Sequence, residues 1–299
     1  MRKTKIGYFA DGPWSHNAFD LLVKDESIEI CFIVPRSDSL DSILYDYSLK
    51  YNIIYLKGYN INSDEFYEIT KHFHCDLFIS MSFNQIFKQK ILTQPMMGAI
   101  NCHAGKLPFY RGRNILNWAL INDEKEFGIT VHFIDTGIDT GDIILQRCFP
   151  ISEKDNYSTL LNISYIECAK VLYDAIKLLQ KGSYTRIKQK DIHPVGFYCG
   201  QRKIGDEKII WDQKSRDIFN FIRAICTPGP RATSTINGNK VFINQANLIQ
   251  DAVNYKCILG QVISKTEKGY LVKTQDNLIE IYDINVENNY TIKIGDRFN

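Results

Sequence analysis

The first half of the chain alternates short apolar runs with segments of helical periodicity, and this alternation constrains the fold more than any other feature. Five runs rich in Ile, Val and Phe are predicted to be buried strands, at residues 6–10, 28–34, 53–57, 77–81 and 99–103. Helices are predicted between them at residues 15–24, 40–51 and 63–73, with Ser15 and Ser63 as N-caps. The pattern predicts an α/β fold, with a mostly parallel sheet covered by helices on both faces. Such sheets bind ligands at the carboxyl ends of their strands.

The second half extends this sheet and then changes character. Strands are predicted at residues 129–134 and 143–148, around a turn at 135–142, and a long amphipathic helix follows at 158–180. A charged connector at 202–210 and a helix at 215–225 precede the TPGP turn at 227–230. Five short strands are then predicted at residues 232–237, 240–245, 260–265, 270–274 and 278–284. Short, evenly spaced strands with Gly and Asn turns predict a small antiparallel open barrel, similar to an OB-fold.

The predicted architecture is therefore a Rossmann-like domain and a small β-barrel domain. The first covers residues 1–200, a linker and helix cover 201–229, and the barrel covers 230–299. A length of 299 residues is sufficient for one large core and a smaller one.

Composition excludes several classes of protein. Hydrophobic residues make up 44% and charged residues 23%, as in soluble globular proteins, and no apolar run reaches the roughly 18 residues that span a bilayer. The apolar run at 6–10 is too short for a signal peptide, so we expect a cytoplasmic protein without a membrane partner. The 8 cysteines are spread singly, which predicts free thiols and no metal site. A net charge of +2 gives no reason to expect a nucleic-acid partner.

The residues with the clearest chemistry lie between positions 99 and 146. Asn101 and His103 are two apart on a predicted strand, so their side chains point to the same side. An amide can stabilise an oxyanion and an imidazole can accept a proton, although a buried polar pair bonded to backbone would give the same spacing. The GIDTGD segment at 137–142 can present a carboxylate in a cleft, or can be an ordinary hairpin turn.

In combination these motifs closely resemble the formyltransferase family that uses 10-formyltetrahydrofolate. The family includes methionyl-tRNA formyltransferase, glycinamide ribonucleotide transformylase and the sugar N-formyltransferases. The resemblance rests on three motifs in order, Asn101-Cys102-His103, LPFYRG at 107–112 and IDTGD at 138–142, and it extends over nearly the whole chain. It implies that Asn101 holds the formyl oxygen, that His103 is the general base and that Asp139 orients the imidazole. 10-Formyltetrahydrofolate is the implied co-substrate, and no metal is required.

The resemblance also suggests where the two substrates bind. The pterin is expected between the loop after residues 77–81 and the turn at 135–142, at Ser82, Phe83, Phe87, Ile91, Thr136, Gly137, Ile138 and Asp142. The alternative for Phe83 and Phe87 is an ordinary core position. Trp14 and His16 follow the first strand, where a ring could stack on a nucleotide base or be a structural aromatic. Candidates for binding a pyrophosphate or the amine substrate are Lys106, Tyr110, Arg111, Arg113 and Asn114. His72, His74, His132 and His193 show no partner pattern and are interpreted as incidental.

Charge bears on which amine is the acceptor. Residues 34–44 contain one Arg, two Asp and no Lys, and residues 204–299 contain 12 Lys and Arg against 11 Asp and Glu. A tRNA-binding enzyme needs a basic surface. Charge therefore favours a small anionic acceptor. The loop at 106–114 and the RGRN-x2-NW pattern most resemble the sugar N-formyltransferases. This resemblance implies a dTDP- or UDP-linked amino-deoxy sugar of surface-polysaccharide biosynthesis, such as that of O-antigen or lipopolysaccharide. The alternatives are a methionyl-tRNA formyltransferase and a non-catalytic nucleotide-binding module. The sequence leaves open the sugar, the ring position, the nucleotide, the role of the C-terminal domain and whether the chain forms a homodimer.

Overall fold

The computed structural model describes residues 2–39 and 41–299, which form two compact units. The first unit contains the chain up to Gly112, Phe127–Phe149 and Asn162–Cys199. The second contains Arg113–Glu126, Pro150–Leu161 and Gly200–Asn299. The domain boundaries at residues 200 and 229 stay predictions. Leu40, the first residue of the helix predicted at 40–51, lies outside the described residues.

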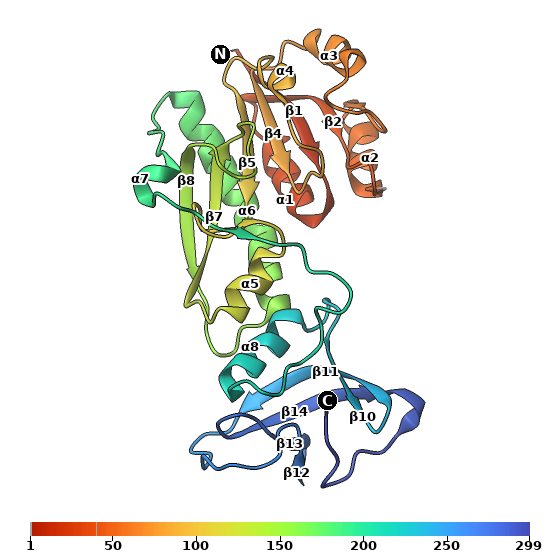
Figure 1. Cartoon of the computed structure of the whole chain (residues 1–299). Coiled ribbons are helices and arrows are strands. Elements are labelled where there is room, and N and C mark those ends of the chain that lie inside the picture. The colour runs from red at the N-terminus through yellow and green to blue at the C-terminus, as the bar shows by residue number, and fades with distance from the viewer. Residues whose placement is uncertain (1, 40) are drawn as a thin grey trace. The chain divides into compact units, whose positions relative to one another are not determined.

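A seven-stranded sheet forms the centre of the first unit (Figure 1). Its spatial order is β3 (Ile54–Tyr55), β2 (Ile28–Val34), β1 (Thr4–Ala10), β4 (Leu77–Met81), β5 (Ala99–His103), β7 (Glu126–Phe133) and β8 (Ile143–Pro150). The pairs from β3 to β5 are parallel, and β7 is antiparallel to β5. The predicted mostly parallel sheet is confirmed, because each apolar run of the first half forms one of its strands.

Helices cover both faces of this sheet. Tyr8 and Phe9 are neighbours on β1, so their side chains point to opposite faces. The Tyr8 ring lies 6.2 Å from that of Phe19 on α1, and the Phe9 ring lies 6.0 Å from that of Phe66 on α3. The helices of this unit are α1 (Gly12–Leu22), α2 (Ser42–Lys50), α3 (Asp64–Lys71), α4 (Gln89–Leu92), α7 (Gln189–Ile192) and most of α6 (Tyr157–Lys181).

The two predicted helix caps have different outcomes. Ser63 is the N-cap of α3, and its hydroxyl accepts a hydrogen bond from the Phe66 amide at 3.1 Å. The prediction for Ser15 is wrong, because α1 begins at Gly12 after an extended Asp11. Ser15 is buried inside the helix, and its hydroxyl donates to the Gly12 carbonyl at 2.7 Å. Proline fits the first turn of a helix, so Pro13 allows the earlier start.

The second unit contains two helices, α5 (Ile115–Ile121) and α8 (Ser215–Ile225), and an antiparallel sheet. The spatial order of the sheet is β10 (Ala232–Ile236), β11 (Asn239–Leu248), β14 (Leu278–Val286), β13 (Gly269–Lys273) and β12 (Val262–Lys265). A short 3₁₀ turn, η1 (Glu287–Asn289), follows β14. Near the C-terminus, Phe298 bridges to Ile236 of β10, and Arg297 bridges to Gln261 beside β12. The chain end thus pairs at both edges of the sheet, consistent with the predicted open barrel.

The elements that the sequence did not predict are short. They are α4, α5, α7, η1 and the two-residue parallel pair β6 (Arg111–Gly112) and β9 (Tyr198–Cys199). A two-residue strand has no periodicity, and its pairing partner is distant in the chain. Among the described residues, no helix combines the length and the apolar character needed to cross a membrane.

Candidate active site

The polar cluster of the first unit begins with the pairing of β5 and β7. Asn101 and His103 lie on β5, two residues apart, and therefore on one face of the sheet. In the antiparallel register Asn101 is opposite His132, and His103 is opposite Thr130. Residues opposite each other across antiparallel strands share a face, so the pairing adds His132 to the predicted Asn101–His103 pair.

The orientation of the His103 ring is set by one hydrogen bond. Its Nε2 lies 2.7 Å from the Tyr110 carbonyl oxygen, which can only accept, so Nε2 carries the proton. In the neutral ring, Nδ1 is then the basic nitrogen, and it lies 3.7 Å from Oδ2 of Asp139. Gly105 packs against the same ring, where an added Cβ would approach Nε2 to 2.4 Å. A side chain at position 105 would displace the imidazole.

Asp139 lies on a tight turn between β7 and β8, with a left-handed φ of 54°. Its Oδ2 accepts a hydrogen bond from the Gly112 amide at 2.9 Å, and its Oδ1 lies 3.5 Å from Nε2 of His132. Gly141 allows the turn to close, because an added Cβ would come within 1.8 Å of the Phe133 carbonyl oxygen. Burial by itself raises the pKa of Asp139, but the positive charges that His103 and His132 carry when protonated, together with the Gly112 amide, hold that pKa well below its ordinary value. The group is a carboxylate at neutral pH.

His132 orients the Asn101 amide. Nδ1 of His132 lies 2.8 Å from the Phe133 carbonyl and therefore donates to it, which leaves Nε2 as an acceptor in the neutral ring. The Asn101 Nδ2 lies 3.3 Å from that Nε2 and 3.5 Å from Asp139 Oδ1. The sequence interpretation of His132 as incidental missed this contact. The available signal was the alternation of Thr130 and His132 as polar residues on one face of an otherwise apolar strand.

The predicted pterin-binding residues fall into two groups. Thr136, Gly137 and Ile138 are exposed, on the same turn as Asp139, and Asp142 ends the turn by accepting from the Phe133 amide at 2.9 Å through its backbone carbonyl. The second group follows β4, where Ser82 is exposed, Phe83 is partly buried, and Phe87 and Ile91 are buried in an apolar cluster with Phe9 and Phe66. The side chains of Phe87 and Ile91 therefore contact the core.

The predicted substrate-binding residues of α1 both have protein partners. The ring of Trp14 stands edge-on to that of Tyr165, at 4.8 Å between centroids. His16 directs Nε2 at both carboxylate oxygens of Asp41, at 2.8 and 2.7 Å. Asp41 also accepts from the Gly12 amide at 2.7 Å. His16 thus joins α1 to the loop before α2.

The remaining predicted substrate-binding residues lie in the segment 106–114. Lys106 is half-buried, and Tyr110 is buried with its ring 4.8 Å from that of Phe197. Arg111 bonds through Nε and Nη2 to Oε1 of Gln189, at 3.0 and 2.7 Å. Arg113 and Asn114 belong to the second unit, where Arg113 donates to Gln201 at 3.1 Å and Asn114 accepts from the Arg202 amide at 3.0 Å.

The site thus presents an oriented amide, a basic imidazole nitrogen and a carboxylate within one polar cluster of an α/β sheet. Groups of these kinds can stabilise an oxyanion and move a proton in an acyl transfer. Among the described residues, no group of three His, Cys, Asp or Glu side chains is arranged to hold a metal ion.

The comparison with protein families identifies the class. Residues 24–176 match the formyl transferase model, and residues 203–299 match the model of the formyl transferase C-terminal domain. The chain belongs to the formyltransferase family, and it is an enzyme of that class. The methionyl-tRNA formyltransferase of Pelotomaculum thermopropionicum is 33% identical over 245 residues, which is 82% of this chain and 77% of the relative. That of Syntrophus aciditrophicus is 32% identical over 246 residues, again 82% of this chain and 77% of the relative.

Solved structures of sugar N-formyltransferases share the fold. WlaRD, a sugar 3N-formyltransferase solved in the presence of dTDP and 5-N-formyl-THF, has a TM-score of 0.69 at 24% identity, covering 97% of this chain and 100% of its own. The N-formyltransferase of Helicobacter canadensis, solved with folinic acid and dTDP-3-aminofucose, has a TM-score of 0.69 at 23% identity, covering 94% and 100%.

Proposed function

We propose that this enzyme transfers the formyl group of 10-formyltetrahydrofolate to the amine of a dTDP- or UDP-linked amino-deoxy sugar. Three observations support the folate co-substrate. They are the family, the Asn101–His103–Asp139 cluster and the folates in the structures of WlaRD and the Helicobacter canadensis enzyme.

The cluster supports a specific assignment of roles. The amine nitrogen attacks the formyl carbon, and the carbonyl electron pair moves to the formyl oxygen, which the Asn101 amide stabilises by hydrogen bonding. His103 takes the amine proton on Nδ1, since Nε2 is bonded to the Tyr110 carbonyl. Asp139, a carboxylate 3.7 Å from that nitrogen, stabilises the resulting imidazolium. The proton then passes to N10 as the carbon–nitrogen bond breaks, releasing tetrahydrofolate and the formamide.

The choice of a sugar nucleotide rests mainly on charge. Arg36 is the only basic residue of the segment 34–44. Its guanidinium forms a bidentate ion pair with Asp38, from Nε to Oδ1 at 2.8 Å and from Nη2 to Oδ2 at 2.7 Å. The segment therefore offers no uncommitted cation for a phosphate backbone. The near-neutral balance of residues 204–299 points the same way.

The second candidate is methionyl-tRNA formyltransferase, which the relatives at 33% and 32% identity favour. The two acceptors are separated by measuring formyl transfer to a panel of dTDP- and UDP-amino sugars and to charged initiator tRNA, at low and at moderate salt. We expect turnover of a sugar nucleotide with a shallow salt dependence, because a single pyrophosphate displaces few counterions. Efficient formylation of the tRNA, steeply weakened by salt and without turnover of any sugar nucleotide, would establish the second candidate instead.

A further inference from the structure

Gln189, the first residue of α7, is buried, with 3% of its surface exposed. Its Nε2 donates to the backbone carbonyls of Asp139 and Gly141, both at 2.8 Å. Its Oε1 accepts from Nε and Nη2 of Arg111 at 3.0 and 2.7 Å. A primary amide has two N–H donors and two acceptor lone pairs, so these four bonds use its full capacity.

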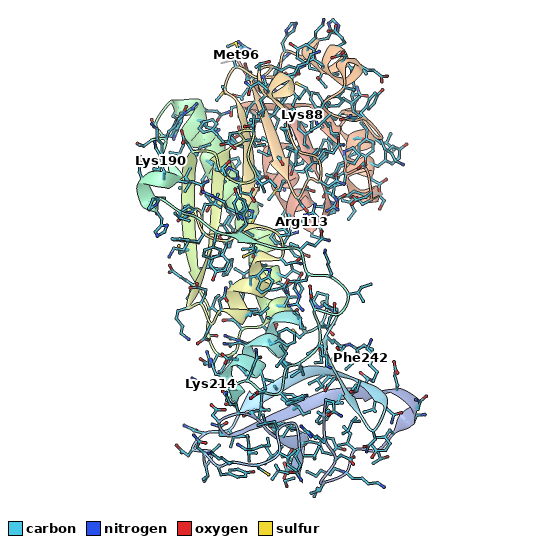
Figure 2. The ribbon with its side chains drawn as sticks, viewed as in Figure 1. Lys88, Met96, Arg113, Lys190, Lys214 and Phe242 are labelled. Atoms are coloured by element: carbon cyan, nitrogen blue, oxygen red, sulfur yellow. The ribbon has the colours of Figure 1, made fainter. Side chains whose placement is uncertain are left out.

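The position of Gln189 is fixed by the sheet. Ile187 exchanges two backbone hydrogen bonds with Ile143, the first residue of β8, at 2.8 and 3.0 Å. The segment that carries Gln189 is therefore held beside the turn that contains Asp139. The next residue, Lys190, is exposed and is labelled in Figure 2. Gln189 is buried, so the two neighbouring side chains lie in different environments.

Gln189 completes a closed set of contacts around the Asp139 carboxylate. This set, called the circuit below, runs from Gln189 through Arg111, Gly112 and Asp139 back to Gln189. Arg111 is followed by Gly112, whose amide binds Oδ2 of Asp139 at 2.9 Å. The backbone carbonyl of Asp139 in turn accepts a hydrogen bond from Nε2 of Gln189. A left-handed backbone conformation at a non-glycine residue is strained and persists where surrounding contacts hold it. The φ of 54° at Asp139 has such contacts at both its carboxylate and its carbonyl.

We propose that Gln189 is a positioning residue that holds the Asp139 turn and the Arg111 loop in register, so that the carboxylate faces Nδ1 of His103. The proposal rests on the proposed function, since it takes Asp139 as the partner of a catalytic His103. In this role Gln189 acts through Asp139, because its four hydrogen bonds all go to protein groups.

The first test is Gln189→Met, which keeps the length of the side chain and removes its four hydrogen bonds. We expect kcat for formyl transfer to the best sugar nucleotide of the panel to fall at least tenfold, with both KM values changed less than threefold. The acid limb of the kcat profile should move to lower pH, because a carboxylate that has moved away stabilises the imidazolium less. Hydrogen exchange in residues 135–142 should rise without a general rise elsewhere.

The matched control is Gln180→Met on α6. Gln180 also uses its amide within the first unit, donating to Thr4 at 3.0 Å and to the Ser27 hydroxyl at 3.2 Å. This variant should keep the wild-type kcat and pH profile. Gln189→Glu separates the two halves of the circuit, since a carboxylate still accepts from Arg111 but cannot donate to the two carbonyls. It should lose activity as Gln189→Met does, and it carries the same test if the Met variant does not fold.

Arg111→Met tests the circuit from its other end. If both residues act through one arrangement, the double variant should lose no more than about threefold beyond the worse single variant, whereas independent effects would multiply. Gln189 variants that match Gln180→Met in kcat and pH profile, while Asp139→Asn is impaired, would overturn this inference alone. Full activity in Asp139→Asn and His103→Ala would instead overturn the proposed active site.

Discussion

Two clusters of polar side chains, one in each unit of this chain, differ in what they bond to. In the barrel, the Trp211 indole donates to Ser234 at 3.0 Å, and Ser234 donates to the Asn299 carbonyl at 2.9 Å. The fully buried Lys273 donates to the carbonyls of Asp276 and Asn277, both at 3.3 Å. These groups complete a turn and hold the chain end, so we interpret them as structural.

In the polar cluster of the first unit, the side chains face one another and not backbone carbonyls alone. Asn101 lies 3.3 Å from His132 and 3.5 Å from Asp139, and His103 lies 3.7 Å from Asp139. The contacts of Asp139 with Asn101 and His103, at 3.5 and 3.7 Å, are weak hydrogen bonds at best, which leaves these side chains with capacity for a substrate. Polar groups fully bonded to backbone stabilise a fold, whereas polar groups directed at one another and incompletely bonded are available for chemistry.

The sharpest test of this contrast is the removal of the proposed catalytic groups. Asn101→Ala and His103→Ala should each lower kcat by about 10²–10³, corresponding to ~2.7–4 kcal/mol of transition-state stabilisation, with the melting temperature little changed. Steady-state kinetics and thermal unfolding measure the two quantities. The exposed His72→Ala on the end of α3 is the matched control and should keep the wild-type rate. A rate within tenfold of wild type in either cluster variant would contradict its role.

A variant in the barrel should show the opposite result, a loss of stability with little change in kcat. Lys273→Met keeps an unbranched side chain in the core but removes the ammonium donor from the Asp276 carbonyl, whereas the Asn277 carbonyl still accepts from the Thr274 amide and hydroxyl. We therefore expect a loss of about 1–3 kcal/mol in the free energy of unfolding. Urea unfolding measures this loss. The kcat per folded molecule should change less than twofold. The contrast between the units would fail if Lys273→Met lowered kcat severely at unchanged stability.

A smaller effect concerns pH. The pKa of Asp139 is lower in the folded chain than in the unfolded one, so the carboxylate stabilises the fold above the unfolded-state pKa of ~3.9 and this stabilisation is lost as pH falls through the folded-state value. Asp139→Asn should therefore unfold at a lower temperature than wild type at pH 6. The difference should begin to shrink below about pH 4, where Asp139 takes up a proton in the unfolded chain while it is still a carboxylate in the folded one. Asp46→Asn, on the exposed side of α2, should show a smaller difference. A difference that stays constant down to pH 3 would exclude this linkage.

Much of the fold could be predicted from local pattern. The strands β2, β4 and β5 and the helix α8 have the predicted residues at their centres, because continuous apolar runs and helical periodicity are properties of consecutive residues. The start of α1 was predicted wrongly, because residue type alone does not distinguish Ser15 from a serine that caps a helix. Pro13 and the extended Asp11 set the actual start.

The sequence by itself determined the α/β class, the small barrel and the motif that carries Asn101, His103 and Asp139. These depend on composition, period and short spacings, which survive in any arrangement of the chain. Only the tertiary structure brought His132 opposite Asn101, fixed Nδ1 of His103 as the basic nitrogen and placed Gln189 between Arg111 and Asp139. Those contacts join residues that are up to 78 positions apart. These contacts depend on strand register and on the approach of segments that are distant in the chain, and no local pattern encodes either.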